Sequence, residues 1–124
     1  MSSTIGNEWV QLYSNNPKIQ AFAISKDGAI VWQTDNWDLV EDANEIVKAI
    51  KDGKSKITVG GLKYKQVSSD ENSYLASADN DQGHLFIVRI DENALAIAFA
   101  IHSAVPELSV IDVKKTAVAL KGHV

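Results

Sequence analysis

The sequence of 124 residues contains no cysteine, only two prolines and a single methionine. Without cysteine, the chain cannot form a disulfide, an iron–sulfur cluster, a thiolate zinc site or a thiol nucleophile. No apolar run reaches the roughly 20 residues that a membrane span requires. The N-terminus also lacks the basic and then apolar layout of a signal peptide. The chain is therefore expected to work in the cytoplasm.

Basic charge is also in short supply, because twelve lysines and arginines stand against sixteen aspartates and glutamates, a net charge of −4. A general nucleic-acid or membrane binder needs a positive footprint, so this balance argues against both kinds of partner. The composition is 45% hydrophobic and 23% charged, which is ordinary for a globular protein. The length predicts one domain, residues 1–124, with a core that needs no metal or disulfide.

Apolar periodicity and turn residues predict three helices and seven strands. Helices are expected where apolar residues recur every three or four positions, over residues 4–15, about 40–51 and about 106–121. Strands are expected where apolar runs lie between turn residues, over residues 19–24, 29–33, 56–59, 62–68, 73–78, 85–90 and 95–101. This order is typical of an α+β layered domain.

Two of these strands are continuously apolar, over residues 85–88 and 95–101. Strands of this kind are usually covered on both faces, so we expect a central sheet with helices on each side. The alanines of the second run would also suit a helix. The turn residues 91–93 before it favour a hairpin instead.

Residues that carry chemistry are few and scattered. His84, His102 and His123 are far apart and have no partner at helical spacing, which speaks against a metal site; His84 is expected in a solvated turn. Asp79 and Asp81 lack the glycine and final glutamate of a calcium loop. No G-x-S-x-G, phosphate-binding-loop or H-E-x-x-H pattern is present. The sequence therefore predicts neither an enzyme nor a cofactor or metal site.

Three aromatic residues leave two interpretations open. Trp9 and Tyr13 are one turn apart on the first helix, and Trp32 lies in the second strand. They could pack into the core. They could also form an aromatic shelf for proline rings, because a pre-extended proline-rich segment binds such grooves at little entropic cost.

Three segments in this order resemble profilin, the small actin-monomer-binding protein. They are the first helix with Trp9 and Tyr13, residues 23–32 (AISKDGAIVW) and residues 59–64 (VGGLKY), the last similar to the family's Leu-Gly-Gly-x-Lys-Tyr strand. Trp37 falls where many profilins carry an aromatic residue. The resemblance covers nearly the whole chain. It implies a profilin-like α+β fold with a central antiparallel sheet, N- and C-terminal helices on one face and a shorter helix on the other.

The resemblance also implies a function. Profilins bind actin monomers, control their polymerisation and often bind polyproline and phosphoinositides. The implied actin surface comprises the later strands and the first half of the last helix. Carried over by position, it consists of Lys63, Lys65, Val67, Asp79, Asp81, His84, Glu107, Leu108, Ile111 and Lys115.

The last helix departs from the family pattern. Profilins complete their polyproline shelf with aromatic residues on this helix, and here it has none. The candidate polyproline-binding residues are therefore only Trp9, Tyr13 and Trp32, and they predict weak or absent binding of proline-rich peptides.

The charge pattern departs as well, because Asp79 and Asp81 occupy a strand where typical profilins carry basic residues. A phosphoinositide headgroup needs positive charge, so this surface predicts little lipid binding. The remaining basic candidates are Lys54 and Lys56, together with Lys63 and Lys65. These departures point to a divergent member of the family, such as an archaeal profilin.

A second hypothesis is a scaffold or small-GTPase regulatory module of the roadblock or longin type. Such modules share the layout of helices on a sheet and often dimerise. The profilin resemblance instead implies a monomer at the actin cytoskeleton. The segment 60–64 favours the profilin interpretation.

Overall fold

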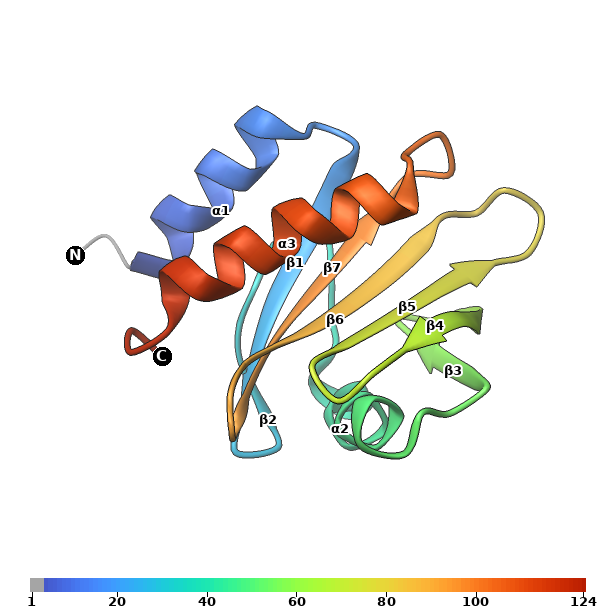
Figure 1. The fold of residues 1–124 in the computed structure, drawn as a ribbon, viewed down its shortest axis with the longest axis horizontal. Coiled ribbons are helices and arrows are strands. Elements are labelled where there is room, and N and C mark those ends of the chain that lie inside the picture. The colour runs from blue at the N-terminus through green and yellow to red at the C-terminus, as the bar shows by residue number, and fades with distance from the viewer. Residues whose placement is uncertain (1–3) are drawn as a thin grey trace.

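Seven strands form one antiparallel sheet in the computed structural model, which describes residues 4–124 (Figure 1). Their order across the sheet is β2-β1-β7-β6-β5-β4-β3. The bounds are β1 (Ile19–Lys26), β2 (Ala29–Gln33), β3 (Lys56–Val59), β4 (Leu62–Ser69), β5 (Ser73–Ala78), β6 (His84–Asp91) and β7 (Ala94–Ala100). The seven expected strands are confirmed, and the run near residue 95 is a strand of a hairpin.

The helices are α1 (Thr4–Asn15), α2 (Ala43–Asp52) and α3 (Pro106–Leu120). A short 3-10 turn, η1 (Val40–Asp42), precedes α2, so the expected helix over 40–51 begins as a 3-10 turn. Pro106 occupies the first turn of α3, where its missing amide hydrogen costs no hydrogen bond. Across residues 4–124, no helix is long and apolar enough to cross a membrane.

The terminal helices lie on one face of the sheet, and α2 lies on the other (Figure 1). The two faces differ because side chains alternate along a strand. On β7, alanines at 94, 96, 98 and 100 face α1 and α3, whereas Leu95 and Ile97 face α2. The small side chains let α3 approach the sheet closely. The expected arrangement of helices is confirmed.

Each helix contributes an apolar stripe to the core. Val113, Ala117 and Leu120 of α3 are buried, as expected from their spacing. Ile46 and Ile50 do the same for α2. Burying a large aliphatic side chain contributes about 1.5–3 kcal/mol, so these contacts hold the helices on the sheet.

The glycine pair of the β3–β4 hairpin makes a sharp bend. Gly60 and Gly61 have φ angles of 60° and 81°, a conformation that glycine adopts without the clash of a Cβ atom. The side chain of Trp37 packs over this turn, and a Cβ atom added at Gly60 would lie 2.8 Å from its Nε1 atom. The turn therefore requires glycine at position 60 for two separate reasons.

We expect Gly60→Ala to lower the free energy of unfolding by at least about 1 kcal/mol more than Gly61→Ala. Both substitutions place alanine at positive φ, at a cost of about 1–2 kcal/mol. Only the first adds a clash with Trp37, because nothing lies within 4 Å of a Cβ atom at Gly61. Chemical denaturation of the two variants measures the difference. Equal losses of stability would contradict the close packing of Trp37 on the turn.

Candidate functional site

One row of paired residues crosses the sheet beside the start of α3. Lys56 of β3 lies opposite Lys65 of β4, Lys65 opposite Ser77 of β5, and Ser77 opposite His84 of β6. His84 lies opposite Ala100, the last residue of β7, and the loop that follows leads into α3. Directly paired residues point to the same face of a sheet. The row therefore shares the face on which α3 lies.

His84 links this row to the loop before α3. Its Nδ1 atom lies 2.7 Å from the Ser77 hydroxyl, and its Nε2 atom lies 3.1 Å from the carbonyl oxygen of His102. Because a carbonyl oxygen only accepts, Nε2 donates to His102, and the Ser77 hydroxyl, which can donate or accept, is the partner of Nδ1. The expectation of a solvated turn is wrong for His84. It is the first residue of β6 and is only half-exposed, because two hydrogen bonds hold it against the neighbouring elements.

The three candidates on β4 lie on the surface. Lys63 and Lys65 are exposed, whereas Tyr64 between them is buried and faces α2. This burial raises the pKa of the Tyr64 hydroxyl. Val67 is 55% exposed and lies at the β-bulge that the register shows between residues 66 and 68. The bulge explains why Val67 stays exposed while the side chains of β5 beside it are covered.

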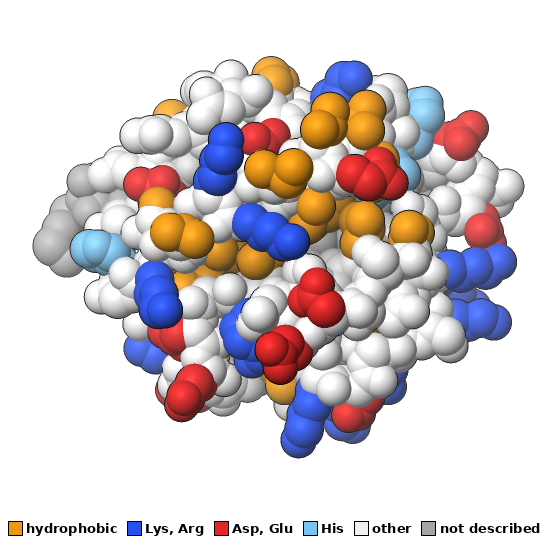
Figure 2. Space-filling model, viewed as in Figure 1, with side chains coloured by type: hydrophobic (Ala, Val, Ile, Leu, Met, Phe, Trp, Pro, Cys, Tyr) orange, Lys and Arg blue, Asp and Glu red, His pale blue; other side chains and the backbone are white. Residues whose placement is uncertain are grey.

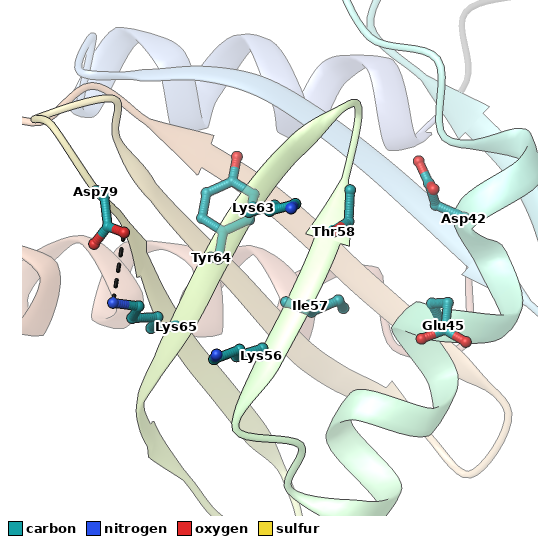
Figure 3. A pocket seen from close by; sticks show the side chains of 9 residues that line it. All are labelled: Asp42, Glu45, Lys56, Ile57, Thr58, Lys63, Tyr64, Lys65 and Asp79. Carbon is teal, nitrogen blue, oxygen red and sulfur yellow. Dashed lines mark ion pairs between the residues drawn. The ribbon is translucent and has the colours of Figure 1, made fainter.

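The lysines surround a cavity of about 650 Å³ at the β3 edge of the sheet. Figure 3 shows the side chains that line it: Asp42, Glu45, Lys56, Ile57, Thr58, Lys63, Tyr64, Lys65 and Asp79. Lys65 Nζ lies 3.5 Å from Asp79 Oδ2. Three basic side chains thus meet three acidic ones, which leaves the lining without the net positive charge that a phosphoinositide headgroup requires.

The predicted basic patch is divided by the edge of the sheet. Lys54 follows α2 and pairs with Glu45 of that helix at 3.0 Å. The hydrogen bond and charge of Lys54 hold the pKa of the Glu45 carboxyl below its usual value. Lys56 instead lies opposite Lys65 on β4. The structure therefore brings Lys56, Lys63 and Lys65 together and leaves Lys54 with α2.

Asp79 and Asp81 lie in the exposed turn between β5 and β6. Asn80 and Asp81 adopt positive φ angles of 60° and 56°, and the Ala78 amide donates to the Gly83 carbonyl at 2.9 Å. The backbone conformation of this turn therefore determines where the Asp79 and Asp81 side chains leave the chain. Within residues 4–124, no group of three or more histidine and acidic side chains is arranged to hold a metal ion.

Helix α3 presents an apolar outer surface. Leu108 and Ile111 are 62% and 47% exposed, and Glu107 is exposed beside them. Figure 2 shows hydrophobic side chains gathered along α3, with basic side chains at the right-hand edge, where Figure 1 places β3 and β4. Lys115 lines a groove between α3 and α1, and its spacing of four and seven residues from Ile111 and Leu108 places it on the same outer face. The four predicted α3 residues are all exposed on this side of the helix.

Lys114 is a residue that the sequence analysis missed. It lines a hollow of about 750 Å³ between α3 and the ends of β5 and β6. Amide hydrogen bonds from Asn72 and Ser73 lower the pKa of the Asp70 carboxyl, and the charge of Lys114 lowers it further. The spacing of three residues from the buried Ala117 is the signal that could have placed Lys114 next to the sheet.

The three candidate shelf aromatics gather around Phe22 of β1. Trp9 stacks on Phe22 with ring centroids 5.9 Å apart, and Trp32 meets Phe22 edge-on at 6.1 Å. Tyr13 lies 5.6 Å from Trp9 and is 46% exposed. Since Phe22 is fully buried, Trp9 and Trp32 cover the core, and Tyr13 is the most exposed of the three aromatic residues.

Comparisons with known proteins place this fold among its relatives. No family model matches the chain. The chain is similar to Thor profilin of Thorarchaeota archaeon (strain AB_25), with 31% identity over 128 aligned residues that cover all of both proteins. It is similar to LokiProfilin2 as found in a complex with rabbit actin, with 27% identity, full coverage of both chains and a TM-score of 0.90. Acanthamoeba castellanii profilin IB shares the fold at 14% identity, with a TM-score of 0.76 over 91% of this chain and 93% of that one.

We expect Trp32→Ala to lower the free energy of unfolding by about 2 kcal/mol. This is less than the 3–5 kcal/mol typical of a fully buried aromatic residue, because Trp32 is partly exposed. Val31→Ala, at its 54% exposed neighbour on β2, is the matched control and should cost below about 0.5 kcal/mol. Thermal unfolding of both variants provides the comparison. Equal stability of the two would mean that Trp32 is a free shelf and no part of the core.

Proposed function

The chain belongs to the profilin family, and from this premise we propose that it binds an actin or actin-like monomer and regulates actin polymerisation. LokiProfilin2, which is 27% identical over its full length, forms a complex with rabbit actin. This relationship favours the profilin interpretation over the roadblock or longin alternative. The protein would act as one domain, as a monomer and without catalysis, in the cytoplasm at the actin cytoskeleton.

The proposed docking surface combines the exposed side of β4, the β5–β6 turn, the half-exposed His84 and the first half of α3. Its residues are Lys63, Lys65, Val67, Asp79, Asp81, His84, Glu107, Leu108 and Ile111. One observation carries the assignment, namely the row that joins Lys65 through Ser77 to His84 beside the loop before α3. Lys115 is exposed on the same side of α3 and also borders the groove toward α1, so it would contact the partner at the margin of this surface.

The chemistry of this surface suits a protein partner. Exposed Val67, Leu108 and Ile111 supply apolar contacts, and charged side chains surround them. Interfaces commonly combine an apolar centre with a polar rim. An actin monomer bound to this surface cannot use the covered face to join a growing filament. Binding would therefore lower the concentration of actin monomers available for polymerisation.

We propose only weak binding of the family's other ligands. For polyproline, Trp9 and Trp32 already pack on Phe22, and α3 adds no aromatic ring. For phosphoinositides, Asp79 and Glu45 offset Lys65 and Lys54. The actin monomer is therefore the partner that the surface supports best.

We expect the double substitution Lys63→Glu and Lys65→Glu to weaken binding of monomeric actin by at least about tenfold, because like charges brought together across an interface cost several kcal/mol. Both side chains are exposed, so the variant should remain folded. Titration of labelled monomeric actin measures the affinity, and circular dichroism checks the fold.

The matched control is Lys48→Glu with Lys51→Glu, which makes the same change of net charge on exposed positions of α2, across the sheet. We expect this control to bind actin within about twofold of the unchanged chain. Loss of binding in both variants alike would argue against the proposed surface, and absence of binding by the unchanged chain to any actin would overturn the proposed function.

We also expect a proline decamer to bind with a Kd weaker than about 1 mM. The peptide would have only the partly exposed edges of Trp9, Tyr13 and Trp32 to contact. Tryptophan fluorescence during a peptide titration reports binding directly. A saturable change at micromolar peptide would show that a complete shelf exists without aromatic residues on α3.

A further inference from the structure

Two lysines of the docking surface, Lys63 and Lys65, lie close to a third, Lys56, on the neighbouring strand β3. Lys56 lies directly opposite Lys65, and Lys63 lies two residues away on the same exposed side of β4. Like charges opposite one another on a sheet destabilise the pair. The cluster therefore attracts an anionic group from within the protein or from a partner.

Asp79 is the acidic side chain of this protein that offsets part of the positive charge of the lysines. Its Oδ2 atom lies 3.5 Å from Lys65 Nζ, and both side chains are largely exposed, at 68% and 63%. The β4–β5 register pairs Tyr64 with Ala78, so one further step places Asp79 next to Lys63. The other ion pair within residues 4–124, between Lys54 and Glu45, belongs to α2.

The backbone determines where this carboxylate lies. Asp79 begins a turn that the Ala78–Gly83 hydrogen bond closes at 2.9 Å, with two following residues at positive φ. Figure 3 shows Lys65 directed toward Asp79, while Lys56 and Lys63 point elsewhere. Of the three lysines, only Lys65 is paired in the free protein.

We propose that Asp79 is a specificity-determining residue of the actin-binding surface, a proposal that rests on the proposed function. In the free protein its carboxylate forms an ion pair with Lys65. A partner that binds Lys65 must therefore replace this carboxylate with an acidic group of its own. The charge of Asp79 also opposes any acidic group that faces the turn. The surface thus selects an actin-type monomer with acidic groups facing β4 and neutral or basic groups facing the β5–β6 turn.

The test measures binding of monomeric rabbit actin to Asp79→Asn at low and high salt. We expect Asp79→Asn to bind about two- to fivefold more tightly at low salt, the range that corresponds to an exposed ion pair of up to about 1 kcal/mol. The gain should disappear at about 1 M salt, where screening acts within a few ångströms. Asp35→Asn, an exposed turn residue after β2 at the opposite edge of the sheet, makes the same charge change and should bind like the unchanged chain.

A double-mutant cycle with Lys65→Gln assigns the effect to the pair. In the Lys65→Gln background, Asp79→Asn should give a clearly smaller gain, because no lysine remains to be released and only the direct repulsion by Asp79 is relieved. Unchanged or weaker binding by Asp79→Asn, a gain of the same size without Lys65, or an equal gain in Asp35→Asn would each overturn the proposal. Absence of actin binding by the unchanged chain would instead overturn the proposed function and the proposal with it.

Discussion

The proposed surface depends on the hydrogen bonds that His84 makes to Ser77 and to the carbonyl oxygen of His102. A hydrogen bond contributes only about 1 kcal/mol to stability, yet this pair ties the loop before α3 to β5 and β6. Because Ser77 lies opposite Lys65, the connection continues through the sheet to the charged side of β4. A partner that contacts both α3 and β4 must match this arrangement.

The distribution of small side chains explains why the surface is open. Alanines line one face of β7, and larger side chains line the other. The helix α3 packs over β6 and β7, whereas Lys63, Lys65 and Val67 on β4 stay exposed beside it. The core thus lies toward the centre of the sheet, and the exposed lysines and Val67 lie toward its β3–β4 edge. The side chains that form the core are therefore different from those that form the proposed binding surface.

Local signals made most of the fold predictable. Periodicity predicted α1, and apolar runs between turn residues predicted the seven strands, because both signals depend on neighbours in the sequence. The role of His84 could not be predicted, since it requires the register of three strands. The same holds for Val67 at its bulge. The family resemblance therefore proposed which residues form the site, but the direction of each side chain could be described only from the structure.

Cross-saturation NMR on the complex tests the central claim most directly. The chain would be deuterated and bound to protonated monomeric actin, and saturation of the actin signals would spread only to amides at the interface. We expect attenuation along β4, in residues 79–84 and in the first turns of α3, with α2 unaffected. Attenuation confined to α2 or to β2, with β4 unchanged, would contradict the account.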